Sequence, residues 1–111
     1  MCVNIETARP GTPEEFTVEE IGSRYIRLRW SPGQQTVPVT DFLLQHKKSS
    51  TLSWHDKSTV MNTTVESPTT QTMLSDLSPV TNYDIRIFAT NEIGHSLPTE
   101  PLAVLTLPEG R

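Results

Sequence analysis

Residues 77–94 read LSPVTNYDIRIFATNEIG, and this stretch contains the strongest structural signal of the chain. A tyrosine, two isoleucines and an alanine occupy every second position from Tyr83 to Ala89. A period of two is typical of a β-strand with one buried face, because successive side chains of a strand point to opposite sides. The stretch therefore predicts a strand that buries Tyr83, Ile85 and Ile87 and ends at a glycine-containing turn.

The same period recurs along the chain. In the clearest case Ile26, Leu28 and Trp30 alternate with two arginines. Proline and glycine between such segments mark turns. Strands are predicted at 16–21, 26–30, 42–47, 59–65, 70–74, 83–89 and 102–106, with a further short strand around Leu52–Trp54. The sequence thus predicts an all-β fold, a seven-stranded antiparallel Greek-key β-sandwich.

Composition narrows the class of protein further. The chain has 111 residues, a formal net charge of −4 and 34% hydrophobic residues, which fits one globular domain. Nine prolines disfavour long helices, and no apolar run approaches the roughly 20 residues of a membrane span. The acidic balance argues against nucleic acid as a partner. Because Cys2 is the single cysteine, no disulfide can form within the chain.

The two ends of the chain resemble each other. In both 3–10 and 104–111, apolar and polar residues alternate and are followed by a proline. Residues 1–12 are interpreted either as the end of a preceding module plus a linker or as a flexible tail. The domain itself is expected to span 13–108, and 109–111 would lead to a following module.

The segment 77–96 resembles the most distinctive stretch of fibronectin type III domains, where a leucine and a proline precede the tyrosine that opens strand F. Trp30 matches the strand B tryptophan of that family, and 13–18 looks like strand A. The resemblance covers nearly all of 13–108. It implies a disulfide-free sandwich in which the Tyr83 hydroxyl bonds backbone a few residues upstream. The expected core comprises Leu28, Trp30, Phe42, Leu44, Leu77, Tyr83, Ile85 and Ile87, with Trp30 and Tyr83 meeting between the sheets.

His46 stands where the family usually has an aromatic residue. We interpret it as a partly buried ring that fills the aromatic's place and bonds a neighbour. A pH switch is the alternative, because histidine titrates near neutrality.

No constellation of catalytic residues is evident. His46, His55 and His95 fall on different predicted elements without metal-ligand spacing, and the glycines are isolated turn residues. The sequence therefore predicts a protein that is not an enzyme and needs no cofactor or metal.

Binding is the remaining class of function. Alternation places Leu43, Arg86 and Phe88 on the outer face of two neighbouring strands, where together with Trp54 they would form an apolar patch rimmed by charge. The loops 32–38 and 91–97 are a second candidate. On the other sheet, Arg27 and Arg29 lie near Glu19 and predict ordinary cross-strand ion pairs.

Asn62-Thr-Thr64 is a glycosylation motif of secreted proteins, although a chain rich in serine and threonine also produces it by chance. It is expected in a loop.

The string 89–96 looks like modules of neural immunoglobulin-superfamily adhesion receptors, such as the sidekick and Down syndrome cell adhesion molecule families. The resemblance implies a non-catalytic, extracellular interaction and spacer module of a cell-membrane adhesion or guidance receptor. Its partners would be proteins: neighbouring modules, a second copy or a ligand, with a membrane anchor only elsewhere in the parent protein. An intracellular scaffold module of the muscle-filament type, or a non-catalytic appendage of a larger enzyme, is the alternative.

Overall fold

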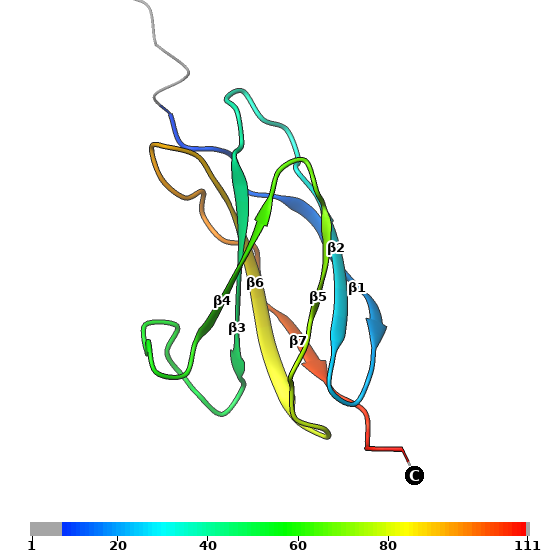
Figure 1. The fold of residues 1–111 in the computed structure, drawn as a ribbon. Coiled ribbons are helices and arrows are strands. Elements are labelled where there is room, and N and C mark those ends of the chain that lie inside the picture. Colours follow the sequence, from blue (N-terminus) through cyan, green and yellow to red (C-terminus); the bar gives the residue numbers. More distant parts are fainter. Residues whose placement is uncertain (1–7, 111) are drawn as a thin grey trace, which may run out of the picture.

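The computed structural model describes residues 8–110, and these residues form seven strands and no helix. Figure 1 shows them as two layers along one long axis, with the described chain entering at one end and leaving at the other. The strands are β1 (Glu14–Ile21), β2 (Ile26–Ser31), β3 (Asp41–Lys48), β4 (Met61–Glu66), β5 (Gln71–Leu74), β6 (Asn82–Thr90) and β7 (Leu102–Leu105).

Two antiparallel sheets face each other. One has the strand order β1-β2-β5 and the other β4-β3-β6-β7, so the chain crosses between sheets after β2, after β4 and after β5. This arrangement confirms the predicted seven-stranded sandwich. β1 shifts register between Val18 and Glu20, which places a bulge at the paired glutamates.

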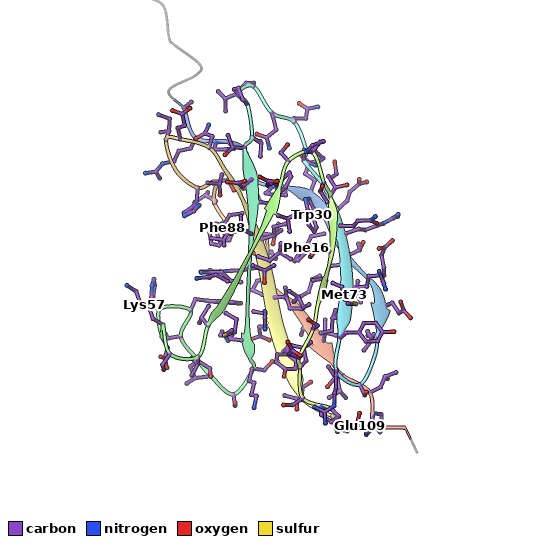
Figure 2. The ribbon with its side chains drawn as sticks, viewed as in Figure 1. Phe16, Trp30, Lys57, Met73, Phe88 and Glu109 are labelled. Carbon is purple, nitrogen blue, oxygen red and sulfur yellow. The ribbon has the colours of Figure 1, made fainter. Side chains whose placement is uncertain are left out.

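Alternation along β2 and β6 determines which side chains fill the space between the sheets. The eight residues expected in the core are all buried, and Ile26, Ala89 and Val104 join them. At one end of this core the Trp30 ring packs edge-on against Phe42, with ring centroids 5.4 Å apart, and against Phe16 at 6.4 Å. Figure 2 shows Phe16 and Trp30 together between the layers.

Tyr83 closes the other end of the core. Its hydroxyl accepts a hydrogen bond from the backbone N–H of Ser78 at 2.8 Å, as expected for a tyrosine at the start of this strand. The expectation that Trp30 and Tyr83 meet was wrong. Trp30 packs on Phe42, whose partner on β6 is Ala89, six residues from Tyr83. At about 3.3 Å per residue the two sites lie roughly 20 Å apart.

The predicted strand around Leu52–Trp54 was also wrong, since these residues form loop and turn between β3 and β4. Leu52 is 92% exposed, so the segment lacks the buried face that a strand of alternating residues would need. The proposed strand ending of a preceding module, like Cys2, lies in residues 1–7, outside the part of the chain described.

Candidate functional site

The outer face of the four-stranded sheet presents side chains from paired strands. In the β3–β6 register Leu43 lies opposite Phe88 and Gln45 opposite Arg86, and these side chains are half-buried. Their immediate neighbours along each strand point into the core, so face and core alternate residue by residue. The structure therefore brings Leu43, Arg86 and Phe88 together on one surface, as the pattern predicts.

Trp54 reaches this surface from the loop between β3 and β4. The Arg86 guanidinium carbon lies 4.3 Å from the centroid of the Trp54 ring and 5.0 Å from that of Phe88. Such cation–π contacts contribute about 0.5–1 kcal/mol each at exposed sites. We call Leu43, Trp54, Arg86 and Phe88 the aromatic patch.

Lys47 supports the aromatic patch from below. The residue is only 4% exposed, and its Nζ lies 4.8 Å from the centroid of the Trp54 ring. That ammonium donates hydrogen bonds to the backbone carbonyl of Thr51 at 2.6 Å and to Asp84 at 2.9 Å. Lys47 thereby ties the start of the Trp54 loop to the sheet. Alternation along β3 puts Lys47 on the outer face, but its burial depends on the path of the loop and could not be predicted from the sequence.

Asp84 balances the charge of Lys47. Burial acts to raise the pKa of Asp84, but hydrogen bonds from Ser49 and Lys47 and the Lys47 charge outweigh it and hold the pKa below the ordinary value. The Asp84 carboxylate is therefore ionised near neutral pH and is bonded to Lys47 under the aromatic patch, which leaves Arg86 as the half-buried cation of the patch itself.

Arg86 pairs with no carboxylate of the described residues. Its Nε donates to the Gln45 side-chain oxygen at 2.9 Å, and burial lowers the pKa of the guanidinium without removing its charge. The two arginines of β2 differ from Arg86 because both form ion pairs: Arg27 with Glu20 at 3.2 Å and Arg29 with Glu19 at 3.9 Å. The predicted cross-strand pairs are thus present, with Glu20 as the partner of Arg27.

In each of the two candidate loops, 32–38 and 91–97, one polar side chain holds the segment that leads into β1. Asn91 accepts hydrogen bonds from the N–H groups of Ile93 and Gly94, and its side-chain nitrogen donates to the carbonyls of Ala8 and Pro38. In the other loop, Gln35 exchanges two hydrogen bonds of 2.8 Å with the backbone of Gly11. The polar groups of these two side chains are therefore used within the molecule, which favours the sheet face as the recognition surface.

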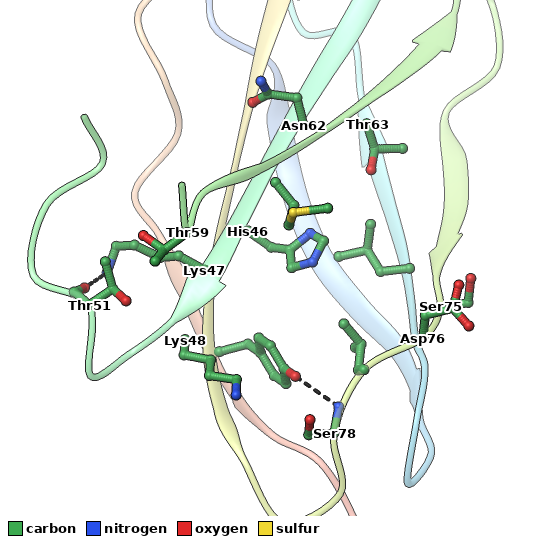
Figure 3. A pocket seen from close by; sticks show the side chains of 14 residues that line it. His46, Lys47, Lys48, Thr51, Thr59, Asn62, Thr63, Ser75, Asp76 and Ser78 are labelled. Atoms are coloured by element: carbon green, nitrogen blue, oxygen red, sulfur yellow. Dashed lines mark hydrogen bonds between the residues drawn. The ribbon is translucent and has the colours of Figure 1, made fainter. Parts of the chain in front are cut away.

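A cavity of about 530 Å³ opens between the edges of β4 and β5, close to His46. Figure 3 shows the imidazole directed into it. Met61, Leu74, Leu77 and Tyr83 also line this cavity. His46 is 9% exposed and packs edge-on against Tyr83, but its Nδ1 has no hydrogen-bond partner among residues 8–110. The expected bond to a neighbour was therefore wrong at this atom. Met61, Leu74 and Leu77 contribute apolar side chains to the cavity, and the Tyr83 hydroxyl is already bonded to Ser78.

Burial lowers the pKa of His46, so acid should destabilise the fold through this residue. As pH falls, His46 is protonated in the unfolded chain at a higher pH than in the folded protein. The free energy of unfolding therefore decreases as pH falls below about 6.5, the ordinary pKa of histidine. Replacing His46 with phenylalanine should raise the unfolding free energy on the order of 1 kcal/mol, because a buried polar atom without a partner is removed. It should also flatten the dependence of that energy on pH.

Urea unfolding of both proteins at pH 7.5 and 5.5 tests this prediction. His55 and His95 are exposed and present in both proteins, and the carboxylates titrate at lower pH. An equal loss of stability in the two proteins would show that His46 does not carry the pH dependence.

Two further observations concern other classes of function. Among residues 8–110 no group of three or more histidine, cysteine or acidic side chains is arranged to hold a metal ion. Nor does this part of the chain contain a helix with the length and apolar character needed to cross a membrane.

Comparison with known proteins identifies the family to which this β-sandwich belongs. A profile of the Fibronectin type III domain matches residues 11–104, and the chain belongs to that family. It is 30% identical to chicken neurofascin over 84% of its length, 32% to zebrafish contactin-1a over 92%, and 35% to chicken neuronal cell adhesion molecule over 85%. These relatives are neural adhesion receptors of the immunoglobulin superfamily with fibronectin type III modules. The chain spans only 7–10% of their length.

Solved structures agree on the fold. The FN1–FN3 domains of chicken CNTN1 superpose with a TM-score of 0.74 at 20% identity, covering 86% of this chain and 32% of that one. A two-domain segment of chicken tenascin gives 0.76 at 18%, covering 89% and 51%. Domains A168–A170 of titin give 0.72 at 18%, covering 89% and 32%. At these identities the likeness establishes the fold alone.

Proposed function

We propose that this chain is a non-catalytic, extracellular interaction and spacer module of a cell-surface adhesion receptor, and that it contacts protein partners through the aromatic patch. One observation carries the proposal: Trp54 and Phe88 flank the Arg86 guanidinium on a sheet face outside the hydrophobic core. The similarity to neurofascin, contactin-1a and neuronal cell adhesion molecule supports a receptor of this kind over a muscle-filament scaffold.

The composition of the aromatic patch fits a binding surface. Tryptophan and arginine are enriched among residues that dominate binding energy, and they act when a partner excludes water from them. Because Arg86 has no carboxylate partner among residues 8–110, a protein that offers one would form a new charge-assisted hydrogen bond. We therefore expect an acidic group at the centre of the partner's surface, and a second copy of this chain, which has thirteen aspartates and glutamates, can supply one.

The spacer role is supported by contacts that hold both ends of the domain. At the exit, Arg24 donates to both carboxylate oxygens of Glu109, with a shortest distance of 2.7 Å. At the entry, Asn91 holds the carbonyl of Ala8 at 2.8 Å. These contacts fix the directions in which the chain enters and leaves, so neighbouring modules would be oriented by the sandwich.

Phe88→Asp and Trp54→Ser should each weaken binding about tenfold or more while leaving the melting temperature within a few degrees, because both residues lie outside the core. Aggregation of beads coated with the module measures binding to a second copy. Met73→Asp is the matched control, since Met73 is a 45% exposed apolar residue of β5, on the other sheet (Figure 2).

The outcomes separate the alternatives. If beads coated with wild-type protein from a bacterial host, which attaches no glycan, do not aggregate, docking of a second copy is contradicted and the spacer role remains. Equal losses in Phe88→Asp and Met73→Asp would contradict the assignment of binding to the aromatic patch. If Phe88→Asp unfolds, Phe88 contributes to the core and the assigned face is wrong.

A further inference from the structure

The strand β4 borders the aromatic patch and carries the glycosylation motif. The motif was expected in a loop, but Asn62 lies in β4, an edge strand, opposite Gln45 of β3. Asn62 and Thr64 are both exposed, and their spacing of two along a strand puts them on the same face. Both side chains that define the motif therefore face solvent beside the patch.

A row of hydrogen bonds determines which atom of Asn62 faces solvent. Arg86 has only donors, so Gln45 must turn its oxygen toward the guanidinium, at 2.9 Å. The Gln45 nitrogen then faces β4 and donates to the side-chain oxygen of Asn62 at 3.2 Å. In consequence the Nδ2 of Asn62 points away from this row and has no hydrogen-bond partner among residues 8–110. Nδ2 is the atom to which an N-linked sugar is attached.

We infer that Asn62 is an N-glycosylation site and that its glycan covers the aromatic patch, so that modification controls docking there. The second half of this inference rests on the proposed function. In the reaction, Nδ2 forms a bond to the anomeric carbon of an oligosaccharide carried on a lipid pyrophosphate. The bond between that carbon and the pyrophosphate oxygen breaks, and the amide gives up one proton to the departing lipid pyrophosphate. No oxidation or reduction is involved.

The geometry of the sheet supports the shielding. Asn62, Gln45 and Arg86 form one row across β4, β3 and β6. Adjacent strands lie about 4.8 Å apart, so Asn62 is roughly 10 Å from Arg86 along the surface. An N-linked glycan is bulky and hydrated. Attached at this distance on the same face, it would occupy the space that a partner needs to reach Arg86 and Trp54.

The glycan itself is tested by secreting the protein from a eukaryotic host and measuring its intact mass before and after peptide N-glycosidase. Wild type and Thr64→Ser should carry a glycan, since serine preserves the motif. Thr64→Ala should carry none, although it keeps Asn62 and its bond to Gln45. Unmodified wild-type protein would overturn the glycosylation site, whatever the aromatic patch binds.

The shielding is tested with the same three proteins in the bead assay. Glycosylated wild type should aggregate at least about tenfold less than Thr64→Ala, and glycosidase treatment should restore aggregation. Equal aggregation of glycosylated wild type and Thr64→Ala would overturn the shielding and leave docking intact. If no form aggregates, docking of a second copy fails and the shielding with it, while the mass measurement still decides the glycosylation site.

Discussion

Replacing Trp30 with alanine is expected to lower the free energy of unfolding by about 3 to 5 kcal/mol. The residue is 5% exposed, and its ring contacts Phe16 from the same sheet and Phe42 from the opposite one. Truncation would leave a cavity at the point where the two sheets are held together. Because domains of this size are stable by about 5–15 kcal/mol, this single change would remove a large share of the total. Urea unfolding followed by tryptophan-independent circular dichroism measures it.

Trp30→Phe is the informative control. The indole Nε1 is buried and has no hydrogen-bond partner in the described part of the chain, so phenylalanine removes an unsatisfied donor while keeping an aromatic ring in place. We expect it to cost less than half as much as alanine. A loss below about 1 kcal/mol in Trp30→Ala would contradict the two-sheet packing around this ring.

Tyr83→Ala is expected to destabilise the opposite end of the sandwich by a similar amount, about 3 to 5 kcal/mol. The ring is 5% exposed and packs against His46, and its hydroxyl receives the Ser78 N–H. Loss of the ring would therefore remove both apolar packing and the contact that holds the crossover between β5 and β6. Equilibrium unfolding in urea measures the loss.

Tyr83→Phe separates the two contributions of this residue. It keeps the ring and removes the acceptor of the Ser78 bond, so about 1 kcal/mol should be lost. If Tyr83→Phe were as damaging as Tyr83→Ala, the hydroxyl contact rather than ring burial would dominate. Since Trp30 and Tyr83 lie far apart, the double alanine variant should show additive losses, provided that it still folds.

These core residues and the aromatic patch are separated by the alternation of β6. Ile87 is fully buried, and the next residue, Phe88, is half exposed on the outer face. A slip of one residue would exchange the two surfaces. The contrast between the large expected effect of Tyr83→Ala on stability and the small effect of Phe88→Asp therefore tests the register as well as the function.

Local patterns predicted much of the fold. Alternation in 26–30 and 83–89 predicted both the strands and the residues that they bury, because side-chain direction along a strand depends only on position parity. The same parity predicted that Arg86 and Phe88 share the outer face. The weaker pattern at Leu52–Trp54 failed because that segment has no buried face. The motif at Asn62 was expected in a loop, but it lies in β4, within the predicted strand 59–65.

Contacts between distant segments required the tertiary structure. The sequence places His46 on the inner face but does not specify the neighbours of its Nδ1, which finds no hydrogen-bond partner within 8–110. The sequence likewise suggests that Trp54 lies near the outer face. The burial of Lys47 beneath the Trp54 ring, however, depends on the path of the loop between β3 and β4.

The sequence by itself determined the two layers, their antiparallel strands and which residues point inward, since these follow from a period of two and from turn residues. Only the tertiary structure decided that Trp30 and Tyr83 occupy opposite ends of the core and that Gln45 links Arg86 to Asn62. Such relations depend on the register between strands far apart in sequence. That register is selected by the packing of the whole sandwich, because no local segment contains both partners.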